Sequence, residues 1–544
     1  MIIIGIGGSD HDASCCLLED GELKVYIEEE RLTKEKHGNG VKSSMLKSVD
    51  YCLEYMGMKY DDVDYFISND IYSPRLNNKK MYMNNLIRIN HHLAHMASAF
   101  YLSEFDEAAM LISDGSGSIM SHFHMETITL GFAKNNKFEV LDKVYGNNSL
   151  NPESIDIVKG NSFGRFYSKV SNLCGFELHN DGKLMGLASY GKPRFIDMFR
   201  TFFQLTFTPN GLDVIIDFNS QFKNLYKKLF EETNEEKKFQ LKADYAYAAQ
   251  AVLEEKTFEI INYLYKKTKC PNLCYAGGVA LNSVLNGKIK RMTPFDNVYI
   301  PPVPNDSGTA IGAALYGYYN LFTDKKPCHK QLNTAFWGKE YDKEHYQKAI
   351  LKYSDQIVIE ETYTVLSVVD DLINKKVIGW YQGRSEIGPR ALGNRSILAD
   401  PRHAEMKDII NNKVKFRESF RPFAPIVLEE YTSDIFDTDF IPNPFMLYVG
   451  QVKEEKQKMI PAVTHVDGSA RLQTLSYQNN PKLYDVLRGF YQKTGVPVLM
   501  NTSFNTKSKP IVETPEDAIN CMLSCEMDVL YLGDYRIIKK EEKT

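Results

Sequence analysis

The 544 residues exceed what one hydrophobic core usually organises, so the length predicts two or more domains. Hydrophobic residues at 43% and charged residues at 25% are ordinary globular values, which argue against long disorder or a fibrous repeat. The net charge of −5 provides no general basic field, so nucleic acid and anionic membranes are not expected partners. Without a basic leader or an apolar run of about 18 residues, we expect a cytoplasmic protein.

The cysteines are odd in number, nine in all, and contain no CxxC pair. This usage predicts reduced, mostly buried thiols. The pairs Cys270/Cys274 and Cys521/Cys525 have a spacing that would also suit a metal on a helix, which is the alternative interpretation.

The chain opens with three apolar strand candidates, at residues 2–6, 13–18 and 23–28. Asp20-Gly21 predicts a hairpin turn between the second and third strands. Between the first two strands lies the loop Gly7-Gly8-Ser9-Asp10-His11-Asp12, whose backbone amides could approach a phosphate closely. An ordinary polar loop is the alternative.

Two more apolar runs lead into small-residue turns, at residues 109–118 and 273–282. Three such turns in one half of a chain are typical of the split nucleotide site of actin-like and sugar-kinase folds. Residues 309–319 read as a small-residue helix, and the stretch 322–341 is polar. We therefore predict two domains, at residues 1–340 and 341–544.

A histidine-rich helix candidate begins near Asn90. His91 and His95 are four residues apart and share one helix face, so two imidazoles could hold one cation. Asp114 at a strand end and Asp306 at a helix start could complete the ligand shell. His92 competes for the same role, and a histidine cluster that only hydrogen-bonds is the alternative. Two histidines with carboxylates suit Fe²⁺, Mn²⁺ or Zn²⁺.

Arginine is concentrated in the second half of the chain. Six of the 16 arginines fall between Arg384 and Arg421, among Phe416, Phe420 and Phe423. A guanidinium presents a rigid fork to phosphate and carboxylate, so the cluster indicates an anion pocket. A solvated basic surface, or one that stacks RNA bases on its aromatic residues, is the alternative.

Short motifs occur in one order along nearly the whole chain. Those of the first part are His11-Asp12-Ala13-Ser14, His91-His92-x-Ala94-His95, Ser113-Asp114-Gly115, Gly182-Lys183-Leu184-Met185-Gly186-Leu187-Ala188 and Gly277-Gly278-Val279-Ala280-x-Asn282. Those of the second are Gly388-Pro389-Arg390-Ala391-Leu392-Gly393, Lys415-x-Arg417, Phe420-Arg421-Pro422-Phe423-Ala424-Pro425, Asp467-Gly468-Ser469-Ala470-Arg471 and Asn501-Thr502-Ser503-Phe504-Asn505.

In these motifs the chain resembles the NodU/CmcH carbamoyltransferase family. The resemblance implies an α/β protein in which an amino-terminal ASKHA domain (actin-like, ribonuclease H-like) is fused to a YrdC-like α/β domain. It implies that ATP, with Mg²⁺, and carbamoyl phosphate form carbamoyl adenylate in the second domain. The first domain would then carbamoylate a hydroxyl of a small-molecule or sugar acceptor. A homodimer is the default expectation.

The resemblance also implies residue roles. His91, His95, Asp114 and Asp306 would hold the metal, with Fe²⁺ favoured. His11 would accept the proton of the acceptor hydroxyl, and the alternative is a loop histidine bonded to the backbone. Lys183 would contact a phosphate or the acceptor, and the alternative is a surface salt bridge. Carbamoyl phosphate would bind Arg390, Lys415, Arg417, Arg421, Arg471 and Asn501. The nucleotide would bind Gly277, Gly278, Asn282 and Ser307, although a tight structural turn would look the same.

One segment departs from the family pattern. Lys507-Ser508-Lys509-Pro510 stands where a Gly-Glu-Pro run is expected, so another carboxylate such as Glu513 would have to substitute. Two further functions use the same domains. A tRNA carbamoyl- or threonylcarbamoyl-modifying enzyme would need a basic docking surface, and an ASKHA ATPase switch would ignore carbamoyl phosphate.

Overall fold

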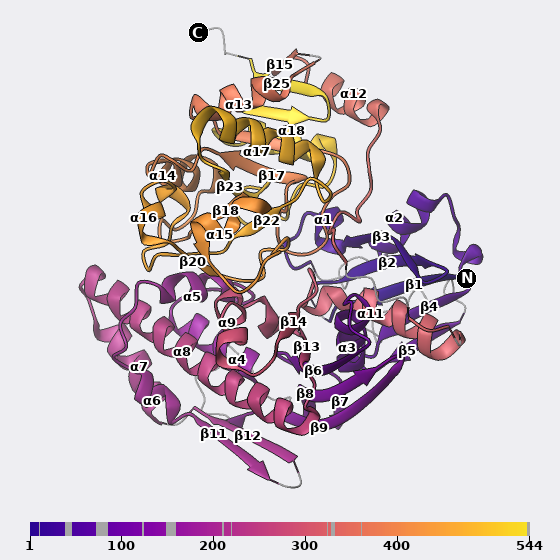
Figure 1. Cartoon of the computed structure of the whole chain (residues 1–544), viewed down its shortest axis with the longest axis vertical. Helices are drawn as coiled ribbons and strands as arrows, with labels where there is room; N and C mark the ends of the chain where they lie inside the picture. The colour runs from indigo at the N-terminus through magenta and orange to yellow at the C-terminus, as the bar shows by residue number, and fades with distance from the viewer. Residues whose placement is uncertain are drawn as a thin grey trace. The chain divides into compact units, whose positions relative to one another are not determined.

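The computed structural model describes every residue except 10, 39–45, 72–84, 122–123, 148–158, 209–210, 219, 324, 328–331, 361 and 541–544. Two predicted positions, Asp10 and Cys328, therefore lie outside the described residues. The chain groups into two compact units (Figure 1). The first consists of Met1–Lys24 and Gly40–Leu332, and the second of Val25–Asn39 and Asn333–Thr544. The segment Val25–Asn39 thus groups with the carboxy-terminal residues. A division of the chain at one position does not describe this grouping.

The chain opens with a five-stranded sheet in the order β3-β2-β1-β4-β5, which belongs to the first unit except for Val25–Glu28 at the end of β3. Its strands are β1 (Ile2–Gly7), β2 (Ser14–Glu19), β3 (Glu22–Glu28), β4 (Tyr65–Asn69) and β5 (Leu86–Ile89). β2 runs antiparallel to β1, whereas β4 is parallel to β1 and β5 to β4. Asp20 and Gly21 both have positive φ, 51° and 85°, as a two-residue hairpin turn requires. The predicted opening hairpin is confirmed.

A second sheet repeats this order. It contains β6 (Glu107–Ser113), β7 (Ile119–Ser121), β8 (His124–Lys134), β9 (Lys137–Asn147), β13 (Asn272–Ala276) and β14 (Asn297–Tyr299). The path runs β14-β13-β6-β8, and β9 pairs with β8. β6, β8 and β9 are antiparallel neighbours, while β13 is parallel to β6 and β14 to β13. One topology is therefore present twice, and the predicted α/β class with an ASKHA-type first unit is confirmed.

The helices that follow the last strand of each sheet pack against one another. These are α3 (His91–Tyr101) after β5 and α11 (Thr309–Tyr316) after β14. α11 is built from small residues, and a Cβ added at Gly312 would stand 1.8 Å from the Ala94 carbonyl oxygen of α3. Only glycine allows this approach. The predicted helix 309–319 continues as the π-helical turn η5 (Gly317–Phe322).

The rest of the first unit is mostly helical. Between β9 and β13 the chain also forms a small sheet, which consists of β10 (Lys159–Gly160), β11 (Phe203–Thr208) and β12 (Gly211–Asp217). The helices are α2 (Lys47–Met56), α4 (Phe163–Leu173), α5 (Asp181–Ala188), α6 (Ile196–Arg200), α7 (Ser220–Glu231), α8 (Glu235–Thr268), α9 (Ser283–Asn286) and α10 (Ile289–Met292), with the short turns η1 (Tyr60–Asp62), η3 (Gly278–Leu281) and η4 (Asp306–Gly308).

The second unit is built on an eight-stranded mixed sheet in the order β15-β25-β24-β16-β17-β23-β18-β22. The strands are β15 (Ile357–Glu360), β16 (Ile378–Tyr381), β17 (Arg395–Ala399), β18 (Ala424–Leu428), β22 (Gln473–Leu475), β23 (Val498–Ser503), β24 (Val529–Leu532) and β25 (Tyr535–Lys539). A smaller sheet joins β19 (Phe436–Asp437), β20 (Gly450–Val452) and β21 (Ser469–Ala470).

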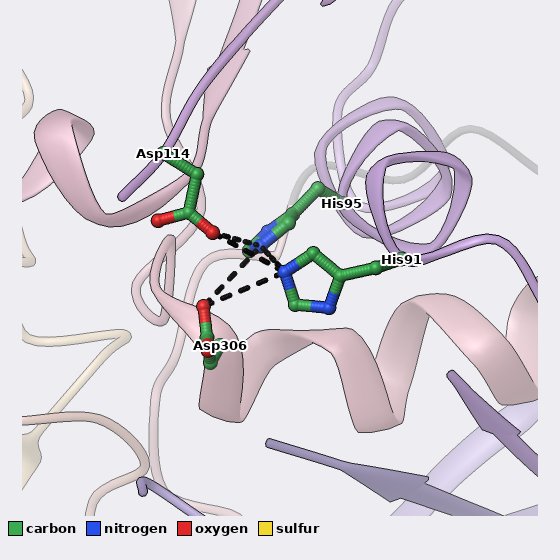
Figure 2. A group of neighbouring side chains, drawn as sticks. All are labelled: His91, His95, Asp114 and Asp306. Atoms are coloured by element: carbon green, nitrogen blue, oxygen red, sulfur yellow. Dashed lines mark hydrogen bonds and ion pairs between the residues drawn. The ribbon is translucent and has the colours of Figure 1, made fainter. Parts of the chain in front are cut away.

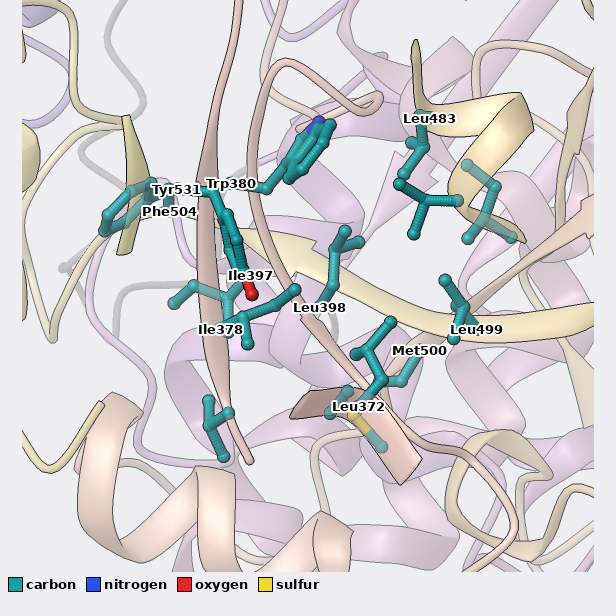
Figure 3. Close-up of a cluster of buried hydrophobic side chains, with 14 of the residues drawn as sticks. Leu372, Ile378, Trp380, Ile397, Leu398, Leu483, Leu499, Met500, Phe504 and Tyr531 are labelled. Atoms are coloured by element: carbon teal, nitrogen blue, oxygen red, sulfur yellow. The ribbon is translucent and has the colours of Figure 1, made fainter. Parts of the chain in front are cut away.

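Helices complete this unit. They are α1 (Glu29–Thr33), α12 (Lys343–Lys352), α13 (Val365–Ile373), α14 (Met406–Ile410), α15 (Thr432–Ile435), α16 (Glu454–Gln457), α17 (Pro481–Thr494) and α18 (Pro515–Leu523), with the turns η6 (Asn411–Lys415), η7 (Glu429–Tyr431) and η8 (Pro461–Val463). Figure 3 shows the core, in which Trp380 of β16 and Leu398 of β17 are buried with Tyr531 of β24. The predicted run 377–381 is thus a central buried strand.

Two predictions from composition concern the whole chain. All eight cysteines that the structure describes are buried and free, as expected for reduced thiols. Neither four-residue pair belongs to a group of possible metal ligands among the described residues. None of the described helices is both long and apolar enough to span a membrane.

We expect Gly312→Ala to destabilise the chain by about 1–3 kcal/mol, because the added methyl group overlaps the Ala94 carbonyl and must push α3 and α11 apart. Urea unfolding measures this change. Gly182→Ala on α5 is the matched control, since nothing lies within 4 Å of its added Cβ and alanine favours a helix. Equal stability of the two variants would show that the helix contact is not close.

Candidate functional site

Four buried side chains of the first unit converge on one point (Figure 2). The Nε2 atoms of His91 and His95 are 3.1 Å apart. Asp114 Oδ2 lies 3.2 and 3.7 Å from these two nitrogens, and Asp306 Oδ1 lies 3.6 and 3.7 Å from them. The four residues predicted as metal ligands therefore present two nitrogens and two oxygens to a common centre.

The position of α3 follows from its first residues. The Asn90 side chain caps the helix by accepting a hydrogen bond from the Leu93 amide at 3.0 Å. The His91 amide, one of the first four that a helix leaves without a partner, donates to Ser118 Oγ at 2.9 Å. His91 and His95 then face the same way because they are four residues apart.

The two aspartates come from the ends of other elements. Asp114 follows β6, and its Oδ1 atom accepts hydrogen bonds from the Gly115 and Gly278 amides at 2.8 and 3.0 Å. This leaves Oδ2 directed at the histidines. Asp306 begins η4, just before α11. The contact between α3 and α11 therefore brings two histidines and an aspartate together from distant parts of the sequence.

The charges of the four side chains depend on one another. Burial and the nearby Asp306 carboxylate oppose ionisation of Asp114, but hydrogen bonds from His91 and His95 outweigh them and lower its pKa. The pKa of Asp306 is lowered in the same way, mainly by His91. Burial alone would lower the pKa of His91, but the two carboxylates raise it to about 10. His91 and the two carboxylates therefore stabilise one another's charged forms.

His92, the alternative ligand, has different partners. Its Nδ1 atom is 2.6 Å from Thr129 Oγ1 and 3.8 Å from the buried Glu126 carboxylate. Burial lowers the pKa of His92. The structure therefore separates His92 from the group of His91, His95, Asp114 and Asp306.

The donor set fits a divalent first-row metal. Two imidazole nitrogens with two carboxylate oxygens are ligands that Fe²⁺, Mn²⁺ and Zn²⁺ accept. The remaining ring nitrogens, Nδ1 of His91 and of His95, are buried without hydrogen-bond partners, so Nε2 is the atom that each ring offers to the centre.

Three of the four residues predicted for nucleotide binding adjoin this group. Gly277 has φ of +95°, and a Cβ there would stand 2.3 Å from the Ser113 carbonyl oxygen, so the turn after β13 requires glycine. The Gly278 amide holds Asp114, and Ser307 follows Asp306. Asn282 caps α9 through the Leu285 amide and bonds Gln250 of α8, so its contacts in this structure are structural ones.

The His11 loop lies beside the Asp306 turn. The Gly8 amide donates to the Asp306 carbonyl at 3.1 Å, and Ser307 Oγ donates to the Asp12 carbonyl at 3.0 Å. His11 Nδ1 is 3.2 Å from Asp12 Oδ2, a partner that can hold the imidazole in one orientation. The predicted base is thus close in the fold to the predicted metal ligands.

The segment before α5 contains a residue that the motifs did not identify. The ring of His179 lies 4.3 Å from the ring of His11, centroid to centroid. Lys183, further along, has its Nζ atom 5.8 Å from the centroid of Phe176. His179 precedes the Gly182–Ala188 motif by three residues, and this closeness to the motif is the signal that could have identified it.

A second group of predicted residues lies in the second unit. Arg390 is on the loop 387–393, Lys415 ends η6, and Arg417 and Arg421 follow on the next turn. Arg471 lies between β21 and β22, and Asn501 is on β23. These cations are close enough to repel one another, since burial and the charges of Arg390, Arg417 and Arg421 lower the pKa of Arg471. The fold therefore gathers Arg390, Lys415, Arg417, Arg421 and Arg471, which we call the cation cluster.

The cation cluster has little negative charge to balance it. Burial, reinforced by Arg421, lowers the pKa of Arg390 to about 10 and that of Arg417 to about 9. Burial and neighbouring cations also lower the pKa of Lys415 and of Arg471. Within the described chain, the one carboxylate ion-paired with the cluster is Glu418, 3.9 Å from Arg421. Partly buried like charges with so few counter-ions are typical of a site that binds an anion.

Uncharged groups hold some members of the cluster in place. Lys415 Nζ contacts Ser503 and Asn505, with 3.0 Å to the Asn505 carbonyl. The guanidinium of Arg417 lies 4.6 Å from the centroid of the Phe423 ring. Asn501, predicted with the cations, donates to the Ala391 carbonyl at 3.2 Å and to Gln473 at 2.8 Å. Arg390 Nε, Arg471 Nε and Asn501 Oδ1 are buried and have no hydrogen-bond partner among the residues that the structure describes.

The segment that departs from the family pattern is a turn near Lys415. Ser508 has φ of +59°, and the Asn505 side chain donates to the Lys509 carbonyl at 2.7 Å. Glu513, considered as a substitute carboxylate, is fully buried and acts electrostatically on Arg31 and Arg395 rather than on the cation cluster.

Comparisons with known proteins agree with the motifs. Residues 2–74 and 67–315 match the family described as carbamoyltransferase N-terminus, and residues 369–539 match carbamoyltransferase C-terminus. Nodulation protein NolNO of Sinorhizobium fredii is 34% identical over 97% of this chain and 79% of that protein. Nodulation protein NolO of Bradyrhizobium diazoefficiens is 36% identical over 83% of this chain and 79% of that protein. Among solved structures, full-length HypF in its phosphate- and nucleotide-bound form is similar with a TM-score of 0.41 and 16% identity, covering 59% of this chain and 56% of HypF.

We expect His91→Gln to lower metal affinity at least tenfold, whereas His92→Gln keeps it, because only the first removes a donor from the converging group. Metal content after dialysis, measured by mass spectrometry, distinguishes the two. Circular dichroism establishes that both variants fold. Equal metal loss in both would contradict the assignment.

We expect Arg471→Met to stabilise the anion-free chain by about 1–2 kcal/mol, because it removes one of several buried like charges. The same change should reduce the stabilisation that inorganic phosphate confers on the wild type. Thermal unfolding with and without phosphate, at constant ionic strength, measures both effects. Arg488→Met, at an exposed position on α17, is the control and should change neither. An unchanged phosphate response in Arg471→Met would contradict an anion site here.

Proposed function

This chain belongs to the carbamoyltransferase family and is a transferase, and we propose that it is an ATP-dependent O-carbamoyltransferase acting on a hydroxyl of a small-molecule or sugar acceptor. The cation cluster is the observation that carries the proposal. Five cations, of which Lys415 is buried and the four arginines are partly buried, have one ion-paired carboxylate among the described residues, and a doubly charged phosphate would offset their charge.

The second unit would activate the carbamoyl group. Carbamoyl phosphate binds the cation cluster, where its phosphate is released as inorganic phosphate with the uptake of one water. The carbamate oxygen then attacks the α-phosphorus of ATP, so that carbamoyl adenylate and pyrophosphate form. Arg390, Arg417 and Arg471 hold the phosphate oxygens and offset the charge that develops on them. Lys415 adds a point charge at a position set by Ser503 and Asn505.

The first unit would transfer the group. His11 takes the proton of the acceptor hydroxyl, whose oxygen attacks the carbamoyl carbon, and AMP leaves. The Asp12 carboxylate beside Nδ1 orients the imidazole and stabilises its protonated form. His179, whose ring contacts His11, borders the place where the acceptor hydroxyl would approach. The turns at Gly277 and Ser307 receive the nucleotide, and Lys183 contacts its phosphate or the acceptor.

The residues His91, His95, Asp114 and Asp306 would hold a divalent cation, for which we propose Fe²⁺ with Mn²⁺ and Zn²⁺ as alternatives. Bound there, the cation would supply Lewis acidity to a carbonyl or phosphate oxygen. The proposed partners are thus ATP with Mg²⁺, carbamoyl phosphate and the acceptor. Because ATP and carbamoyl phosphate are intracellular metabolites, we place the reaction in the cytoplasm.

We expect the wild type to exchange labelled pyrophosphate into ATP only when carbamoyl phosphate is present. Arg390→Ala should reduce that exchange at least 100-fold, because it removes a fork that positions the phosphate. Arg488→Ala, at an exposed position on α17, is the matched control and should keep full exchange.

ATP hydrolysis that does not respond to carbamoyl phosphate would contradict the proposal and favour an ATPase switch. Carbamoyl-phosphate-dependent exchange followed by carbamoylation of tRNA, rather than of a small acceptor, would correct the acceptor and leave the activation step in place.

A further inference from the structure

Arg390 lies at the centre of a loop, residues 387–393, that has no helix or strand of its own. Gly388 and Gly393 have φ of +88° and +117°, which residues with a side chain rarely adopt. A loop without ladder hydrogen bonds must find other partners for its backbone groups. Only then does a guanidinium at its centre have a defined position.

Buried side chains supply those partners along the carboxyl half of the loop. Glu386 Oε1 accepts hydrogen bonds from the amides of Leu392, Asn394 and Arg395 at 2.7, 2.9 and 3.0 Å. Three loop carbonyls accept hydrogen bonds from side-chain amides. The Ala391 carbonyl accepts from Asn501 at 3.2 Å, that of Leu392 from Gln473 at 2.7 Å, and that of Gly393 from Asn480 at 3.3 Å. This half is therefore held by side chains of the carboxy-terminal part of the chain.

In the amino half, the Ile387 amide donates to the Ala335 carbonyl at 2.7 Å, and two residues from the opposite end of the chain hold Gly388. The Gly388 amide donates to Glu28 Oε1 at 2.6 Å, and Arg31 Nη2 donates to the Gly388 carbonyl at 2.7 Å. Glu28 and Arg31 form an ion pair of 3.1 Å with each other. Both belong to the segment Val25–Asn39, which groups with the second unit. Gly388 is thus held on both sides, two residues before Arg390.

We propose that Glu28 and Arg31 are positioning residues for Arg390, acting through Gly388 to set where its guanidinium meets the phosphate of the substrate. They lie in the part of the chain that matches the amino-terminal family description, yet they serve the anion site of the carboxy-terminal part. The inference rests on the proposed function only for the identity of the phosphate-bearing substrate.

The pair is suited to this role and not only to filling space. Glu28 and Arg31 are almost completely buried, and a charged pair is retained in such a place at a desolvation cost that apolar side chains would avoid. What apolar side chains do not supply is an acceptor and a donor directed at one glycine. A guanidinium fork depends on such placement because it makes two directed bonds, whereas a lysine on a flexible stem adapts.

The experiment measures the affinity of inorganic phosphate and of carbamoyl phosphate by calorimetry on the full chain. Glu28→Gln and Arg31→Lys are each made in the wild type and in Arg390→Lys, which keeps a charge but loses the fork. Glu344→Gln, at an exposed position on α12, is the matched control. We expect each variant to weaken phosphate binding about tenfold in the wild type and less than twofold in Arg390→Lys.

The metal content of the first unit and the KM for ATP should stay unchanged, because neither depends on the fork of Arg390. Weakening of the same size in both backgrounds, or in neither, would overturn the inference. If Glu28→Gln does not fold, the phosphate affinities of Arg31→Lys decide the question, because this variant keeps the positive charge beside Glu28. If the wild type binds phosphate but shows no carbamoyl-phosphate-dependent exchange of pyrophosphate into ATP, the proposed function is refuted. The comparison of phosphate affinities in the two backgrounds then still decides the inference about Glu28 and Arg31.

Discussion

The close contact of α3 with α11 is the constraint on which the first unit depends. Gly312 lets the two helices approach until a methyl group would overlap a carbonyl oxygen. That approach sets the histidines of α3 beside the aspartate that precedes α11, while β6 brings Asp114 to the same place. Because each helix follows the last strand of its own sheet, the ligand group lies at the junction of two copies of one topology.

The two units handle buried charge in opposite ways. In the first, two carboxylates are buried with imidazoles, and against the effect of burial the carboxylates raise the pKa of His91 while the two histidines lower that of Asp114. In the second, one lysine and four arginines gather around a single ion-paired carboxylate of the described residues, and burial together with the neighbouring Arg421 lowers the pKa values of Arg390 and Arg417. Under the proposed function, a cation bound in the first unit and an anion bound in the second would each relieve a repulsion already present.

Much of the fold follows from local patterns. The hairpin at Asp20-Gly21, the buried strand at 377–381 and the helix that starts at His91 were all predictable, because turn residues, apolar runs and four-residue spacing act over short distances. The convergence of Asp114 and Asp306 on the histidines was predicted from their positions at a strand end and a helix start, although spacing along the chain does not fix that geometry. His179 and the pair Glu28 and Arg31 were not, because charged and polar residues usually lie on the surface and no local pattern predicts their burial. The repeated sheet topology was hidden as well, since the second copy contains a long helical insertion between β9 and β13.

The grouping of residues 25–39 with the second unit has a consequence for how such a protein can be taken apart. A gene fragment that begins at the polar stretch near residue 333 would encode the eight-stranded sheet and every member of the cation cluster, yet it would lack Glu28 and Arg31. Gly388 would then lose both of its charged partners, and the amino half of the Arg390 loop would keep the hydrogen bond from the Ile387 amide to the Ala335 carbonyl but not the contacts that hold Gly388. The two units are therefore compact bodies but not interchangeable modules, and a recombination event that joined them anew would have to carry fifteen residues from the far end of the chain.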